Sequence, residues 1–120
     1  YGCGGVAAAM EDRPHGLVDN WLRHIRDIYQ KYEVTLNRVT DPKRRTNKLC
    51  ELNVIEQVSN VCHTTIVQEA WKRGQELAVH GWVYGLQNGL LRDLHVCVRK
   101  ADELSAIYRM AVDEELEEKE

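Results

Sequence analysis

The sequence has 120 residues, which is enough for one domain with a modest hydrophobic core. Its 43% hydrophobic and 29% charged residues are typical of a globular protein, and a net charge of −3 gives no general attraction to nucleic acid or anionic membranes. The basic run Lys43-Arg44-Arg45 is interpreted as a solvated loop. No apolar run approaches the roughly 20 residues that span a bilayer, so the sequence predicts a soluble protein.

The first stretch is a cysteine set between glycines, Tyr1-Gly2-Cys3-Gly4-Gly5-Val6. Because glycine permits unusual backbone angles and close approach, this pattern indicates a strand end that turns into a short helix over residues 4–10. Apolar residues then recur with a 3.6-residue period, which predicts a helix over residues 17–32. Residues 33–45 are polar and contain Asp41-Pro42, which predicts a loop or turn.

Two further helices are expected in the middle of the chain. The first is predicted from about Thr46, a suitable N-cap, to about residue 61, with its apolar residues on one face. The second is predicted from Thr64 or Thr65 to residue 73, and Gly74 is well placed to end it in a left-handed conformation.

The hydrophobic period then changes from that of a helix to that of a strand. Residues 77–85 are apolar on both faces, as in a strand that is covered on both sides. Asn88-Gly89 predicts a tight turn, after which residues 94–98 are expected to return as an antiparallel edge strand. A final helix is predicted from Asp102 or Ser105, and the acidic residues 113–120 are expected to fray.

This order of elements indicates an α/β fold that the chain does not complete. Two strands alone are marginally stable, and a strand buried on both faces, such as residues 77–85, needs parallel neighbours. We therefore expect the later part of a longer domain, with a mostly parallel sheet, flanking helices and an antiparallel edge strand. Residues 1–112 would belong to this domain, and residues 113–120 would form an acidic tail.

Four cysteines stand at irregular spacings, and none forms the Cys-x-x-Cys pattern of a zinc ribbon or redox dithiol. Cys50, Cys62 and Cys97 fall within predicted helices or strands and are interpreted as small buried hydrophobes in a reducing compartment, either the cytoplasm or an organelle. Cys3 has a different setting, because it lies between glycines at a helix start. From the residues alone it could be a metal ligand, a nucleophile or a structural thiol.

Five sequence blocks, spread over about residues 1–98, carry a family resemblance: Tyr1-Gly2-Cys3-Gly4-Gly5-Val6, Trp21-Leu22-Arg23-His24-Ile25-Arg26-Asp27, Cys50-Glu51-Leu52-Asn53-Val54, Ala70-Trp71-Lys72-Arg73-Gly74 and His80-Gly81-Trp82-Val83-Tyr84-Gly85. In this order and at this spacing they resemble the β-class carbonic anhydrases. Any one block would be weak, but five in register are specific. The resemblance implies that family's fold, its zinc cofactor and its tendency to form homodimers or higher homo-oligomers.

The resemblance also implies a catalytic Zn²⁺ held by two cysteines and one histidine, in the patterns Cys-x-Asp-x-Arg and His-x-x-Cys. Cys3 matches the second cysteine, and the histidine would lie just before Tyr1. No cysteine here begins Cys-x-Asp-x-Arg, so the other ligands are expected in an N-terminal portion of the same protein. The N–H groups of Gly4 and Gly5 are candidates for contacts near the zinc-bound water.

Tyr84 matches a tyrosine that helps bind bicarbonate at a regulatory, non-catalytic site in some bacterial-type members. A structural role on a buried strand is the alternative for this residue.

The function that the resemblance implies is zinc-dependent reversible hydration of CO₂ to bicarbonate and a proton, once the N-terminal portion completes the site. Two alternatives stay open: a non-catalytic homologue or fragment that acts as a structural or oligomerisation module, and a related hydrolase of carbonyl sulfide or carbon disulfide. For the 120 residues alone we expect no competent zinc site, and poor solubility or association through the exposed flank of residues 77–85.

Overall fold

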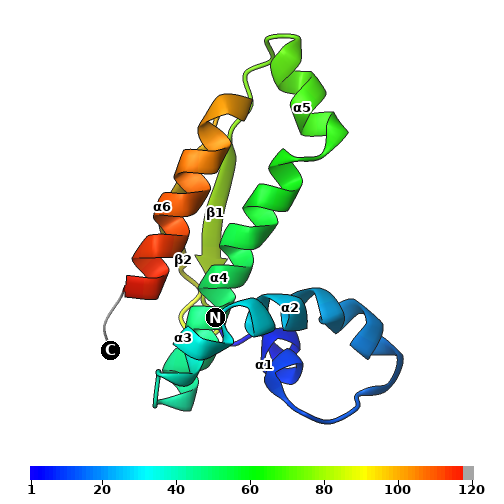
Figure 1. Cartoon of the computed structure of the whole chain (residues 1–120), viewed down its shortest axis with the longest axis vertical. Coiled ribbons are helices and arrows are strands. Elements are labelled where there is room, and N and C mark those ends of the chain that lie inside the picture. Colours follow the sequence, from blue (N-terminus) through cyan, green and yellow to red (C-terminus); the bar gives the residue numbers. More distant parts are fainter. Residues whose placement is uncertain (118–120) are drawn as a thin grey trace.

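The computed structural model describes residues 1–117 of the chain. A long central helix, α4 (Pro42–Cys62), packs on strand β1 (Val79–Tyr84), and the last helix, α6 (Leu104–Glu117), packs on strand β2 (Leu91–Val98) (Figure 1). Near the start of α4, helices α1 (Gly4–Met10) and α2 (Asp19–Lys31) pack together (Figure 1). At the far end, α5 (Thr65–Lys72) leads back to β1. No helix in the described part of the chain is long and apolar enough to cross a membrane.

The predicted loop over residues 33–45 is wrong. A short helix, α3 (Glu33–Asn37), lies within it, and α4 already begins at Pro42. The side chain of Asp41 caps α4 by accepting a hydrogen bond from the backbone of Lys43 at 3.2 Å, and proline fits the first helical turn because it needs no N–H partner there. The basic run is therefore helical, and the N-cap is Asp41 rather than Thr46.

The remaining helix ends agree closely with the sequence. A short 3-10 turn, η1 (Gly16–Val18), precedes α2, and another, η2 (Ala101–Glu103), precedes α6. The hydroxyl of Thr64 accepts a hydrogen bond from the backbone of Val67, so Thr64 is the N-cap of α5 as predicted. Gly74 follows α5 with φ of +80°, the left-handed conformation expected of a glycine beyond a helix end.

The two strands form an antiparallel pair, as predicted, but β2 begins at Leu91 rather than residue 94. The expectation that β1 is covered on both sides is wrong for the described residues. Gly81 and Val83 face the core, and a Cβ atom on Gly81 would lie 3.4 Å from Val54 of α4. On the opposite face Trp82 and Tyr84 are 48% and 52% exposed, because α4 and α6 leave that face open.

The segment before α1 lies beside the end of β1. The backbone nitrogen of Tyr1 donates to the carbonyl of Tyr84 at 2.6 Å, and the carbonyl of Tyr1 accepts from the N–H of Leu86 at 3.1 Å. Two bonds that straddle one residue, here Gly85, are the pattern of a parallel strand pair. Tyr1 therefore lies where a parallel neighbour of β1 would lie, although residues 1–3 form no regular strand, and the predicted short helix follows from Gly4.

The acidic residues at the end of the chain do not fray up to residue 117. Helix α6 continues through Glu117, and Glu115 is buried against α4. The ammonium group of Lys48 lies 3.2 Å from the carboxylate of Glu115 and donates to its backbone carbonyl at 3.1 Å. The last part of the predicted tail, residues 118–120, lies outside the described residues.

Candidate functional site

Cys3 is exposed and occupies the N-cap position of α1. Its backbone is extended (φ −69°, ψ 121°), and its side chain caps no backbone N–H, so the thiol has no structural bond to the helix start. Gly4 and Gly5 are the first two residues of α1, where backbone N–H groups have no partner within a helix. These N–H groups and the thiol therefore lie at the same helix end.

The described residues supply one thiol but no complete metal centre. No group of three or more His, Cys, Asp or Glu side chains in residues 1–117 is placed to hold a metal ion. A catalytic zinc needs three protein ligands and an open position, so Cys3 fits one ligand of such a site. Its exposure fits a ligand that is shared with groups from outside these residues.

The other cysteines are not candidate metal ligands, although the Cys50 thiol is hydrogen-bonded to the backbone of Cys3. Cys50 and Cys62 are buried, as predicted, and burial raises the pKa of both thiols, which keeps them protonated and inert. Cys97 is only partly buried, and its sulfur lies 4.0 Å from Nε2 of His80 on the neighbouring strand.

A polar cluster that the sequence did not predict holds the segment before Cys3. The hydroxyl of Tyr1 donates to Oε2 of Glu51 at 2.5 Å, and Nη1 of Arg92 donates to the same oxygen at 2.7 Å and to the Tyr1 hydroxyl at 2.9 Å. Glu51 is only 4% exposed. Burial, with the hydrogen bond to Glu51, raises the pKa of Tyr1 although Arg92 acts in the opposite direction, so this hydroxyl stays a neutral donor.

Tyr84 lies on the exposed face of β1 rather than on a buried one. Its hydroxyl reaches over the hairpin turn, 3.6 Å from where a Cβ atom of Gly89 would lie. Within the described residues its side chain is therefore half exposed.

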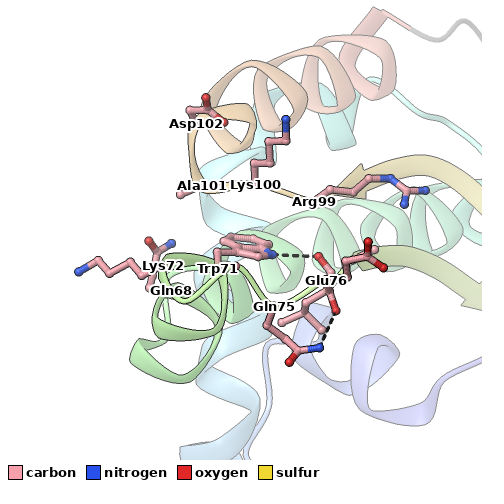
Figure 2. Close-up of a pocket in the computed structure, with 12 residues that line it drawn as sticks. Gln68, Trp71, Lys72, Gln75, Glu76, Arg99, Lys100, Ala101 and Asp102 are labelled. Atoms are coloured by element: carbon pink, nitrogen blue, oxygen red, sulfur yellow. Dashed lines mark hydrogen bonds between the residues drawn. The ribbon is translucent and has the colours of Figure 1, made fainter.

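A cleft of about 880 Å³ lies away from the candidate site. Figure 2 shows it between the end of α5, the segment before β1 and the turn before α6. The indole N–H of Trp71 donates to the carbonyl of Leu77 at 2.9 Å in this cleft. None of Cys3, Gly4, Gly5 and Tyr84 lines it. A smaller hollow of about 400 Å³ does adjoin the Cys3 segment and is lined by Tyr1, Gly2 and the hairpin turn after β1.

Comparisons with known proteins decide the family. The family model described as "Carbonic anhydrase" matches residues 1–91. A solved β-carbonic anhydrase from Coccomyxa, in complex with acetazolamide, superposes with a TM-score of 0.84 at 33% identity, covering 95% of this chain and 52% of that one. The chain belongs to the β-carbonic anhydrase family. The predicted fold class is thereby confirmed, with the described residues supplying an antiparallel pair and its helices.

Three further relatives of this chain come from fungi. A carbonic anhydrase of Emericella nidulans is 44% identical over 96 residues, covering 80% of this chain and 42% of the relative. A carbonic anhydrase of Candida albicans is 32% identical over 117 residues, covering 94% and 41%. A β-carbonic anhydrase of Sordaria macrospora, described as tetrameric, superposes with a TM-score of 0.72 at 29% identity, covering 81% and 49%. The chain thus spans about half the length, or less, of these relatives.

A second unpredicted cluster of this β-carbonic anhydrase chain ties three helices together far from Cys3. The hydroxyls of Tyr32 and Tyr108 each donate to Oε1 of Glu56 at 2.5 Å, and the ammonium group of Lys31 donates to the same oxygen at 2.9 Å. These contacts join the end of α2 to α4 and α6. No motif signals either cluster, because the partners lie 24 to 91 residues apart. A glutamate next to a core residue, as at Glu51 and Glu56, is the only local sign.

Proposed function

We propose that Cys3 is one protein ligand of a catalytic zinc in an enzyme that converts CO₂ and water reversibly into bicarbonate and a proton. The observation that carries this proposal is the exposed, uncommitted Cys3 thiol at a strand-to-helix turn, in a chain of the β-carbonic anhydrase family. The second cysteine and the histidine would come from an N-terminal portion of the same protein, which completes the site.

The residues of this chain would hold the zinc ion and donate hydrogen bonds beside it. The Cys3 thiolate would bind the ion directly, and the N–H groups of Gly4 and Gly5 would donate to the thiolate or to an anion beside it. Zinc in such a site supplies Lewis-acid activation of water near neutral pH. Glycine at residue 5 suits this role because a Cβ atom there would lie 3.7 Å from the Cys3 sulfur.

The exposed face of β1 supports two further parts of the proposal. Tyr84 is half exposed, so it can serve as one contact of a non-catalytic bicarbonate site whose other contacts lie outside this chain. The open apolar surface around Trp82 suits burial in a homodimer or a higher homo-oligomer, in line with the tetrameric Sordaria macrospora relative.

The test compares the full-length protein with its Cys3→Ser variant, using Cys97→Ser as the matched control because that thiol is also accessible but lies on β2. Zinc content is measured by mass spectrometry and CO₂ hydration by stopped flow with a pH indicator. We expect zinc and activity in the wild type and the control, and neither in Cys3→Ser. A wild type that contains zinc yet hydrolyses only carbonyl sulfide or carbon disulfide, or a zinc-free inactive wild type, would refute the proposal.

A further inference from the structure

We propose that Tyr1, Glu51 and Arg92 form a positioning anchor that fixes the Cys3 segment against α4 and β2 and thereby sets how tightly Cys3 binds metal. The inference rests on the proposed zinc site but concerns three residues that the reaction itself does not use. None of the three is proposed to touch the metal; they act through the backbone that leads to Cys3.

The anchor joins three parts of the chain through one buried oxygen. Oε2 of Glu51, on α4, receives the Tyr1 hydroxyl at 2.5 Å and Nη1 of Arg92, on β2, at 2.7 Å, and Arg92 also donates to the Tyr1 hydroxyl at 2.9 Å. A buried carboxylate is costly unless charged and hydrogen-bonded partners surround it. Glu51 therefore holds the Tyr1 side chain firmly, because releasing it removes a partner from a buried charge.

The backbone of Tyr1 is fixed as well as its side chain. Its backbone nitrogen and carbonyl bond to Tyr84 and Leu86 on either side of Gly85, so Tyr1 is held by the sheet and by α4 together. Only Gly2, with φ of +85°, separates this fixed residue from Cys3. A Cβ atom on Gly2 would lie 3.5 Å from the side chain of Leu86, so the link also packs closely.

The thiol has no comparable restraint of its own. The Cys3 side chain caps no N–H of α1 and is exposed. Its position is therefore inherited from the backbone: Ala7 donates to the Cys3 carbonyl at 3.2 Å on the helix side, and the Tyr1 anchor acts on the strand side. A metal ligand whose placement depends on its neighbours loses affinity when those neighbours loosen.

The chain offers a close chemical match for a control. Tyr108 also donates to a glutamate, Glu56, at 2.5 Å and also accepts from a cation, Lys31, at 2.8 Å, but it joins α6 to α4 and not to the Cys3 segment. Tyr1→Phe and Tyr108→Phe therefore each remove one hydroxyl from a tyrosine, glutamate and cation cluster. A general loss of stability would affect both variants, whereas loss of the anchor affects only the first.

Two measurements on the full-length protein test the proposal. The zinc dissociation constant is obtained by competition with a chromophoric chelator, and we expect it to rise about tenfold in Tyr1→Phe, as for other supporting contacts of metal ligands. Hydrogen exchange of the Leu86 amide, which bonds to the Tyr1 carbonyl, is followed in metal-free protein. We expect exchange about tenfold faster in Tyr1→Phe, as for the loss of one hydrogen bond to a charged group. Tyr108→Phe should change neither quantity.

A double variant shows whether the anchor acts as a unit. Because Glu51→Gln weakens the same contacts, its effect on zinc affinity should be much smaller in the Tyr1→Phe background than alone. If Glu51→Gln does not fold, the Tyr1→Phe and Tyr108→Phe pair still decides the question, since each removes a single hydroxyl.

The possible results separate the anchor from the zinc proposal. Equal zinc affinity and equal Leu86 exchange in Tyr1→Phe and wild type would overturn the anchor. Faster exchange with unchanged zinc affinity would overturn its effect on metal binding. A wild type that binds no zinc would refute the proposed function, but Leu86 exchange would still support the anchor if faster in Tyr1→Phe and overturn it if unchanged.

Discussion

The buried pair of Lys48 and Glu115 allows a sharp test of the structure, because the sequence alone placed Glu115 in a frayed tail. Both side chains are only 10% exposed, and the ammonium group lies 3.2 Å from the carboxylate. Replacing Glu115 with alanine removes the carboxylate from beside a buried ammonium group, which keeps its 3.1 Å hydrogen bond to the backbone carbonyl of residue 115. Removing one partner of a buried pair typically destabilises a protein by about 3–5 kcal/mol.

We take about 3 kcal/mol for Glu115→Ala, since Lys48 keeps its bond to the backbone carbonyl. For a protein of roughly 150–250 residues this corresponds to a fall in melting temperature of roughly 6–12 °C. The assay is thermal unfolding of the full-length protein, at one protein concentration because association shifts the midpoint. Glu114→Ala is the control, because Glu114 is exposed on the same helix and its loss changes the net charge equally. A Glu115 variant as stable as this control would refute the buried pair.

Two further predictions concern Glu56 and the open face of β1. Burial alone would raise the pKa of Glu56, but hydrogen bonds from Tyr108 and Tyr32 outweigh it and lower the pKa below the ordinary 4.5. Its stabilising effect is therefore present above about pH 4.5 and is lost as the pH falls through the folded-state pKa, so the melting temperature of Glu56→Gln should fall less on acidification than that of wild type. For residues 1–120 alone, we expect association that light scattering detects and that Trp82→Ser reduces more than Trp21→Ser, an exposed tryptophan on α2.

Local chemistry made much of the fold predictable from sequence, but the same signals have two meanings. The N-cap at Thr64 and the left-handed Gly74 were predicted because each has one common role beside a helix. Asp41-Pro42 was taken as a turn, although aspartate before proline also begins a helix, and α4 starts there. Only packing distinguishes a turn from a helix start at Asp41-Pro42. Here the helix continues because the later residues of α4 are buried against β1.

The candidate site also has a part that the sequence predicts and a part that it does not. Cys3 between glycines is a local pattern, and its place at a strand-to-helix turn follows from the residues beside it. The contacts of Glu51 with Tyr1 and Arg92 span 50 and 41 residues, so no period or motif encodes them. The irregularity of β2 is similar: His95 takes φ of +60°, a conformation unusual for histidine, while Asp93 accepts its backbone N–H at 2.8 Å.

The proposed metal ligand, Cys3, lies two residues after Tyr1, which pairs with the end of β1. Tyr1 pairs in parallel with β1 around Gly85, on the edge of β1 that β2 does not occupy. A strand leading into Tyr1 would continue that parallel pairing, and a histidine just before Tyr1 would stand on it, three residues from Cys3 as the family pattern requires. The anchor at Glu51 and Arg92 would then hold the junction between strand and thiol. We therefore expect the parallel strand and the proposed zinc ligands to form together, because both depend on where Tyr1 is held.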